Sequence, residues 1–225
     1  MQNVFSVSED WRATYPGAAA GILMMRDVTN PGQHEGLDRR KAELEGALRS
    51  QFSSRAEIAA LPVLQAYDAY YKRFKKTYHV QGQLESVALK GKPIPHVAAL
   101  VEAMFMAELA NLMLTAGHDL TSIEVPITLD VGKGTESYTM LNGKEQVLKP
   151  GDMMMADARG VISSILYGPD LRTRITPETR QVLFAVYAPP GISENAVYQH
   201  LQTIQANVML IAPGAKVELM QVYSA

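Results

Sequence analysis

The stretch HVAALVEAMFMAELANLMLT, residues 96–115, decides the fold expected for this chain. It is apolar on nearly every side, and a helix of that kind is normally buried at the centre of a domain. The stretch is long enough to span a bilayer, but Glu102, Glu108 and Asn111 would each be costly in hydrocarbon. It therefore predicts a buried central helix and no membrane contact.

Downstream of this helix, the hydrophobic pattern changes to the period of a strand. Residues 125–131 alternate between apolar and other side chains, and Asn142-Gly143 is typical of a tight hairpin turn. The other elements expected here are hairpin strands 138–141 and 146–148, strands 152–156, 161–167, 182–187 and 217–222, and a helix that Ser193 caps, with Val197, Leu201, Ile204 and Val208 on one face.

Upstream of the central helix, the sequence predicts two strands and then two helices. The strands are expected at residues 4–11 and 18–28, on either side of the turn Tyr15-Pro16-Gly17. The expected helices are one with Leu37, Leu44 and Leu48 at helical spacing, and one that begins at Pro62 and carries Leu64, Tyr67, Tyr71 and Phe74.

Together these elements predict an α+β fold, in which helices pack against an antiparallel-rich mixed sheet. No repeat or long linker divides the sequence. We therefore expect a single domain over residues 1–225 with two lobes, helix-rich over about 1–121 and strand-rich over about 122–225.

Composition sets limits on the class of protein. The chain has 225 residues, of which 47% are hydrophobic, so it is long enough to bury a sizeable core. It has no cysteine, which excludes disulfides, thiolate metal sites and a cysteine nucleophile. Residues 1–10 show no secretory signal, so we expect a cytoplasmic protein. The net charge of −2 gives no overall field for nucleic acid, and any such contact must be local.

The common cofactor and metal motifs are absent from the sequence. No two of the five histidines have the i, i+4 spacing of a zinc-binding helix. There is no G-x-S-x-G elbow, phosphate-binding loop or dinucleotide fingerprint. We therefore expect neither a metal nor a cofactor.

His118 is the first candidate for chemistry. It follows Gly117, which is expected to end the central helix, and a partly buried imidazole there can act as a base or bind a ligand. An ordinary histidine at a helix C-terminus, beside the charge of Asp119, explains the same pattern.

Two further polar pairs interrupt apolar elements. Glu108 and Asn111 lie three residues apart on one helix face, which indicates a polar cavity or a satisfied buried network. Ser163 and Ser164 lie in an apolar strand and are candidates for a pocket wall, although ordinary strand packing also explains them.

Two basic clusters are candidates for nucleic-acid contact. Lys72, Arg73, Lys75 and Lys76 are interleaved with aromatic residues, a combination of phosphate-pairing charge and stacking rings that a solvated amphipathic helix also explains. The second cluster, open to the same two explanations, is formed by Arg172, Arg174 and Arg180 around Thr176-Pro177.

From about residue 89 to 190, the order of motifs resembles the B3/B4 domain of the phenylalanyl-tRNA synthetase beta subunit, and especially its freestanding relatives. The segments that carry the resemblance are Gly91-Lys92-Pro93-Ile94-Pro95, Leu100-Val101-Glu102 leading to Asp119-Leu120, Leu141-Asn142-Gly143-Lys144-Glu145 with Leu148, Gly151-Asp152, Met155-Ala156-Asp157, and Thr176-Pro177-Glu178-Thr179 followed by Val182-Leu183-Phe184.

The resemblance implies an editing site that hydrolyses tyrosine wrongly attached to phenylalanine tRNA, without metal. It assigns recognition of the amino-acid side chain to Glu145, and a pocket wall to Ser163 and Ser164. Three family positions that are polar carry Met104, Phe105 and Ala116 here, and His118 lies two positions from the family's histidine. These differences favour a more apolar ligand.

The function expected from the sequence is hydrolysis in trans of a mischarged aminoacyl-tRNA, with Glu145 selecting the side chain. Two other classes stay open. One is a non-catalytic module that binds tRNA or a small molecule on the same scaffold, and the other is a hydrolase of a small ester or amide, because a fold does not determine a function.

Overall fold

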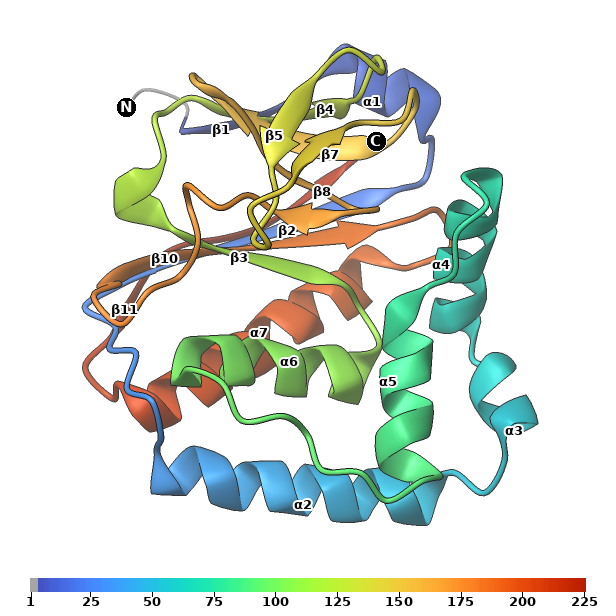
Figure 1. The fold of residues 1–225 in the computed structure, drawn as a ribbon, viewed down its shortest axis with the longest axis vertical. Helices are drawn as coiled ribbons and strands as arrows, with labels where there is room; N and C mark the ends of the chain where they lie inside the picture. The colour runs from blue at the N-terminus through green and yellow to red at the C-terminus, as the bar shows by residue number, and fades with distance from the viewer. Residues whose placement is uncertain (1–3) are drawn as a thin grey trace.

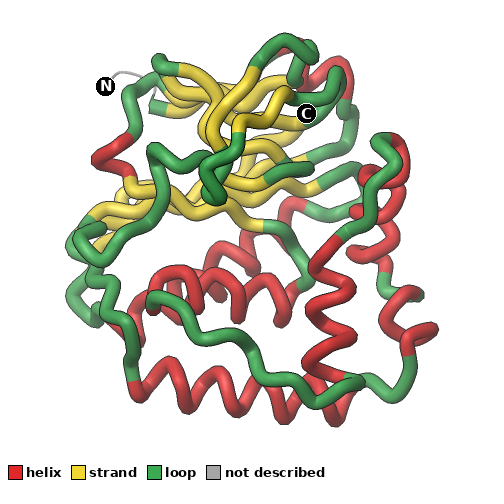
Figure 2. Tube along the Cα trace, in the orientation of Figure 1, coloured by secondary structure: helices red, strands yellow, loops and turns green. Residues whose placement is uncertain are grey.

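A computed structural model describes residues 4–225, and Figure 1 and Figure 2 show two stacked sheets with most of the helices on one side. The helices are α1 (Glu9–Thr14), α2 (Glu35–Gln51), α3 (Arg55–Ala59), α4 (Pro62–Arg73), α5 (His79–Ala88), α6 (Ala99–Asn111) and α7 (Glu194–Ile211), with a 3-10 turn at Leu120–Ser122. The strands are β1 (Phe5–Val7), β2 (Ala19–Arg26), β3 (Thr115–Asp119), β4 (Ile127–Val131), β5 (Ser137–Thr139), β6 (Glu145–Val147), β7 (Met153–Asp157), β8 (Gly160–Ser164), β9 (Gly168–Pro169), β10 (Gln181–Ala188) and β11 (Lys216–Ser224).

The strands form two larger sheets and one hairpin. One sheet has the order β11-β2-β10-β3 and the other β1-β4-β7-β8-β9, while β5 and β6 pair with each other. Pairing is antiparallel except between β1 and β4. The predicted α+β class is therefore confirmed. None of the helices in the described residues has the length and apolar character to cross a bilayer.

The four-stranded sheet lies between the five-stranded sheet and the layer formed by α6 and α7 (Figure 1). Gly21 in β2 allows α7 to approach closely, because a Cβ at this position would lie 2.6 Å from Val197 Cγ1. β2 pairs with both β10 and β11, which come from the other end of the chain. One sheet thus draws on both the helix-rich part, 1–121, and the strand-rich part, 122–225, of the expected single domain.

The central helix is shorter than predicted. α6 ends at Asn111, after which Leu112 adopts a left-handed conformation with φ of 62°. Residues 115–119 then form β3, in which His118 pairs with Leu183 of β10. The prediction that His118 lies at a helix end is therefore wrong. An apolar run does not distinguish a buried helix from a buried strand, and pairing with β10 decides the outcome here.

The N-terminal strand is also shorter than predicted. β1 ends at Val7, and Ser8 then caps α1 by accepting a hydrogen bond at Oγ from the N–H of Trp11. Trp11 is fully buried. The predicted strand over 4–11 is wrong because the serine cap and the two acidic residues of the first turn favour a helix.

Several other local signals are confirmed. Pro62 lies in the first turn of α4, Ser193 caps α7, and Asn142-Gly143 forms the turn of the β5–β6 hairpin. The helices α3 and α5 had no counterpart among the predicted elements.

Candidate functional site

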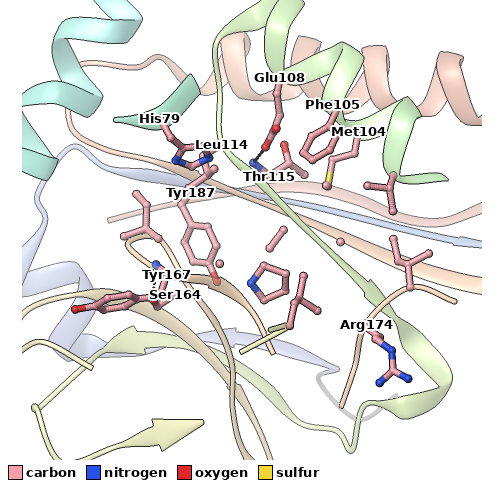
Figure 3. A pocket seen from close by; sticks show the side chains of 18 of the residues that line it. His79, Met104, Phe105, Glu108, Leu114, Thr115, Ser164, Tyr167, Arg174 and Tyr187 are labelled. Carbon is pink, nitrogen blue, oxygen red and sulfur yellow. Dashed lines mark hydrogen bonds between the residues drawn. The ribbon is translucent and has the colours of Figure 1, made fainter. Parts of the chain in front are cut away.

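A pocket of about 690 Å³ lies between α6, the strands β3 and β10, and the chain from 164 to 175 (Figure 3). Its wall is mainly apolar. The polar side chains that line it are His79, Glu108, Thr115, Ser164, Tyr167, Arg174 and Tyr187. Figure 3 shows Glu108 entering from the helix side and Tyr167 and Ser164 from the opposite side. The site is therefore an apolar cavity with a few separated polar groups, which is typical of small-molecule sites.

The three family positions that carry apolar residues in this chain all line the pocket. Met104 and Phe105 come from the pocket face of α6, and Ala116 comes from β3. A second, largely apolar cavity of about 390 Å³ adjoins the pocket and shares Phe105 and His79 with it. The space available therefore suits a ligand with a bulky apolar group.

Glu108 is the one acidic side chain among the residues that line the pocket. It is buried, and its Oε1 accepts a hydrogen bond from the Thr115 N–H at 2.7 Å. Burial raises the pKa of its carboxyl from 4.5 to about 8, because the charged form loses hydration. The carboxyl is therefore mostly protonated at neutral pH and titrates in the range useful for acid–base chemistry.

Asn111 does not share the cavity with Glu108. Its Nδ2 donates to His200 Nδ1 of α7 at 3.2 Å, on a different side of α6. The first alternative, one polar cavity for both side chains, is therefore wrong for Asn111. The second, a buried hydrogen-bond network, is what the structure shows, because Thr115 bonds to Glu108 and to His200, and His200 accepts from Asn111.

His118 is completely buried and does not line the pocket. Its Nδ1 lies 2.7 Å from Thr173 Oγ1, and its Nε2 lies 3.3 Å from Ser163 Oγ. Burial, and to a smaller extent the charge of Arg172, lower its pKa to about 3. The imidazole is therefore neutral, and direct contact with a ligand as a catalytic base has no support in this geometry.

The two consecutive serines have different surroundings. Ser164 lines the pocket, where its Oγ accepts from the Tyr167 N–H at 3.2 Å. Ser163 lies behind the wall, with its Oγ 2.6 Å from the hydroxyl of Tyr187. Ser164 is thus placed for ligand contact, and Ser163 acts through Tyr187.

Glu145 lies on an exposed part of the β5–β6 hairpin. Its Oε1 accepts a hydrogen bond from Ser137 Oγ at 2.7 Å, and it is not among the residues that line the pocket. The expectation that Glu145 shares a cavity with Glu108 is wrong, because the hairpin forms a separate sheet and reaches the pocket through Leu141 instead.

Two arginines of the second basic cluster, Arg172 and Arg174, differ in availability. Arg172 forms a bidentate ion pair with Asp157, with both N–O distances 2.9 Å, so its charge is already matched. Arg174 is exposed and lines the pocket. Of the two, Arg174 is the cation available to a ligand, which corrects the prediction for Arg172.

The first basic cluster adjoins the pocket. Lys76 Nζ lies 4.2 Å from the centre of the Tyr167 ring, and Tyr167 lines the pocket. Arg73 lies over the ring of Tyr15, while Lys72 and Lys75 are exposed. Lys76 and Arg174 therefore provide positive charge at the pocket, while Lys72 is paired with Asp68.

One group of potential metal ligands occurs within residues 4–225, formed by Asp38, His96 and Glu102. Lys41 Nζ lies 2.8 Å from Glu102 Oε2, 3.1 Å from His96 Nδ1 and 3.5 Å from Asp38 Oδ1. The ammonium group therefore takes the place that a cation would need, and the cluster fits a structural role better than a metal centre.

Sequence reasoning missed four polar residues of the pocket, His79, Thr115, Tyr167 and Tyr187. Tyr167 follows a strand, Tyr187 lies inside the apolar strand β10, and His79 begins α5. Tyrosine is common in buried strands, so neither tyrosine carries a local signal of function. Their place in the pocket follows only from the three-dimensional arrangement of β10, β8 and the loop after β8.

The fold is an α+β domain with a mainly apolar pocket between α6 and the sheets. A family model, the B3/4 domain, matches residues 66–210, and the chain belongs to this family. Its whole length is similar to the N-terminal fragment of the phenylalanyl-tRNA synthetase beta subunit from Pyrococcus horikoshii, with a TM-score of 0.50 and 12% identity. The chain spans 55% of that fragment. No curated protein sequence matches it. The family resemblance expected from the sequence is thus confirmed.

Proposed function

We propose that this protein binds the aminoacyl end of a mischarged tRNA in the pocket and hydrolyses its ester in trans, in the cytoplasm. The observation that carries this proposal is the convergence of Met104, Phe105 and Ala116 with Glu108 in one cavity. The family resemblance assigns the first three positions to an editing pocket, and Glu108 supplies a titratable group beside them. The apolar wall favours an amino acid with a bulky apolar side chain.

In this mechanism, Glu108 is the general base. Its carboxylate takes a proton from a water molecule as the water oxygen attacks the ester carbon, and the carboxyl returns this proton to the ribose oxygen as the ester bond breaks. With a pKa of about 8, roughly one tenth of the carboxyl is ionised at pH 7. A base with a pKa close to the working pH combines a useful ionised fraction with a strong tendency to accept the proton.

Positive charge beside the pocket supports delivery of the ligand on a nucleic acid. Arg174 and Lys76 flank the cavity, and each can pair with a phosphate of the tRNA end. Phosphate contacts position a nucleic acid without reading its sequence, so the pocket selects the amino acid and the basic residues hold the strand.

A panel of aminoacyl-tRNAs tests the proposed reaction. We expect release of the amino acid faster than in buffer for charges such as leucine, methionine or phenylalanine, and little release for small polar charges. The measurement is acid-precipitable radioactivity over time. If no charge is released faster than in buffer although tRNA binds, the hydrolase proposal is contradicted and the non-catalytic binding module is favoured.

Binding of tRNA is expected to depend on the segment 72–76. Replacing Lys72, Arg73, Lys75 and Lys76 with glutamate should abolish a gel shift at low salt, because each lost phosphate contact removes counterion release. The matched control replaces four other exposed basic residues that do not line the pocket, Arg39, Arg40, Arg55 and Lys90, and changes the net charge by the same amount. Equal loss of binding in both variants would show that only overall charge matters and contradict the assigned surface.

A further inference from the structure

Five buried side chains form a continuous chain of hydrogen bonds that ends at the pocket. The order is Asp170, Thr173, His118, Ser163 and Tyr187. Each is 4% exposed or less, so water does not compete for these contacts. The last member, Tyr187, lines the pocket, where its ring is seen in Figure 3. The direction of the hydrogen bonds at Asp170 therefore affects whether the Tyr187 hydroxyl offers a ligand a donor or an acceptor.

The carboxyl group of Asp170 sets the direction of the first bonds. Asp170 Oδ1 accepts from the hydroxyl and from the N–H of Thr173. Burial raises the pKa of this carboxyl, while these two bonds and Arg172, whose Nε lies 3.6 Å from Oδ2, act in the opposite direction. A hydroxyl has one proton to donate, and that of Thr173 is used toward Asp170. Thr173 Oγ1 therefore accepts the bond at its other side, which requires a proton on His118 Nδ1.

The remaining two bonds follow from the neutral state of His118. A neutral imidazole carries one proton, and with Nδ1 protonated, Nε2 is an acceptor. Ser163 consequently donates its hydroxyl proton to Nε2, and its oxygen accepts the proton of Tyr187. Every donor in this series of hydrogen bonds thus points toward Asp170. None of these protons is available to form a hydrogen bond with a ligand in the pocket.

We propose that Tyr187 presents an acceptor-only oxygen to the pocket, so that the ligand group placed against it is a hydrogen-bond donor, such as an ammonium, amine or hydroxyl group. This deepens the proposed function and rests on it, since it takes the pocket as the ligand site. The α-amino group of an aminoacyl ester is a donor of this kind. Ser163 and His118 are positioning residues that act through Tyr187.

A second buried histidine provides an internal reference. His200 Nδ1 accepts from the Asn111 amide, and its Nε2 lies 2.7 Å from Thr115 Oγ1. Because an amide nitrogen is always a donor, His200 carries its proton on Nε2. The two buried histidines are therefore expected in opposite tautomers.

The tautomers are measured directly by NMR of the full chain with 15N-labelled histidine. We expect the Nδ1–H tautomer for His118 and the Nε2–H tautomer for His200, with the signals assigned through His118→Gln and His200→Gln. An Nε2–H tautomer or a charged imidazole for His118 would overturn the proposal. This measurement needs no ligand, so its failure is separate from a failure of the proposed function.

Calorimetry with two neutral probes of similar shape tests whether Tyr187 accepts or donates a hydrogen bond in the pocket. The probes are 2-hydroxy-4-methylpentanamide and 4-methyl-2-oxopentanamide. Only the first has a donor at the second carbon. We expect the native protein to bind it about tenfold more tightly, corresponding to one hydrogen bond. Tyr187→Phe should remove this preference. Ser163→Ala should weaken it, because the Tyr187 proton then becomes free to donate to the oxygen of either probe.

Ser50→Ala, an exposed serine of α2, is the control and should leave the preference unchanged. Thermal unfolding checks that each variant folds. Stronger binding of the oxo probe to the native protein would overturn the proposal. Equal binding that Tyr187→Phe and Ser163→Ala leave unchanged would do the same. Binding of neither probe would contradict the proposed function, while the NMR result still decides the direction of the chain.

Discussion

Replacing Glu108 with glutamine is expected to lower the rate of aminoacyl ester hydrolysis by about a hundredfold to ten-thousandfold, the usual contribution of a general base. Glutamine keeps the size of the side chain and can still accept from the Thr115 N–H. It cannot take a proton from water. The native rate, corrected for the rate in buffer, should rise with pH and level off above the pKa of about 8, and the variant should show no such inflection.

The same substitution has an expected effect on stability with the opposite sign. Because the folded protein holds the pKa of Glu108 above 4.5, this group contributes its full stability below pH 4.5 and loses it as pH rises through about 8. Glutamine has no charge to bury. The variant should therefore gain stability relative to the native protein with rising pH, by at most about 5 kcal/mol for a shift of this size.

Urea unfolding from pH 5 to pH 9 measures this difference. Glu178→Gln, at an exposed acid, is the control and should follow the native curve. If Glu108→Gln and the native protein stay parallel over this range, the carboxyl is not buried in the way described. If the stability curves diverge but the rate of hydrolysis is unchanged, Glu108 is buried as described and is not the base.

Replacing Lys41 with methionine is expected to lower the free energy of unfolding by about 3–5 kcal/mol, because it leaves a carboxylate buried without its partner. Lys41 and Glu102 are both buried, and their charged groups lie 2.8 Å apart between α2 and α6. Glu102 Oε1 also accepts a hydrogen bond from the Val97 N–H, which holds the carboxylate in its buried position.

The double variant Lys41→Met, Glu102→Leu is expected to recover most of this loss, since apolar replacement of a buried ion pair is often neutral. Urea unfolding at pH 7 is the measurement. Lys90→Met, at an exposed lysine, is the control and should change stability by less than about 0.5 kcal/mol. A loss below about 1 kcal/mol for Lys41→Met would mean that water reaches this pair in solution.

The sequence predicts most elements of this fold because their signals are local. Pro62, Ser193 and Asn142-Gly143 determine where an element starts or turns, whatever lies around them. The end of α6 has no such signal. Leu112 adopts a left-handed conformation that leucine rarely takes, and only the pairing of the following residues with β10 accounts for it.

The candidate site was predictable to a smaller extent. Met104, Phe105 and Glu108 share a helix face, so their common position follows from helical spacing once the helix is identified. The place of Glu145 depends on the direction in which the β5–β6 hairpin leaves the sheet. The role of Tyr187 depends on β8, β3 and the loop that carries Asp170 and Thr173. These relations are not encoded in any short stretch of the chain.

The β5–β6 hairpin has a consequence for how this protein can change over evolutionary time. It packs on β7 and β8 through a small cluster formed by Tyr138, Leu148, Met154 and Val161, which is distinct from the main core. The hairpin also contributes Leu141 to the pocket wall. Mutations and insertions in the hairpin can therefore alter ligand preference at little risk to the rest of the domain, and selection can adjust specificity there while the scaffold stays constant.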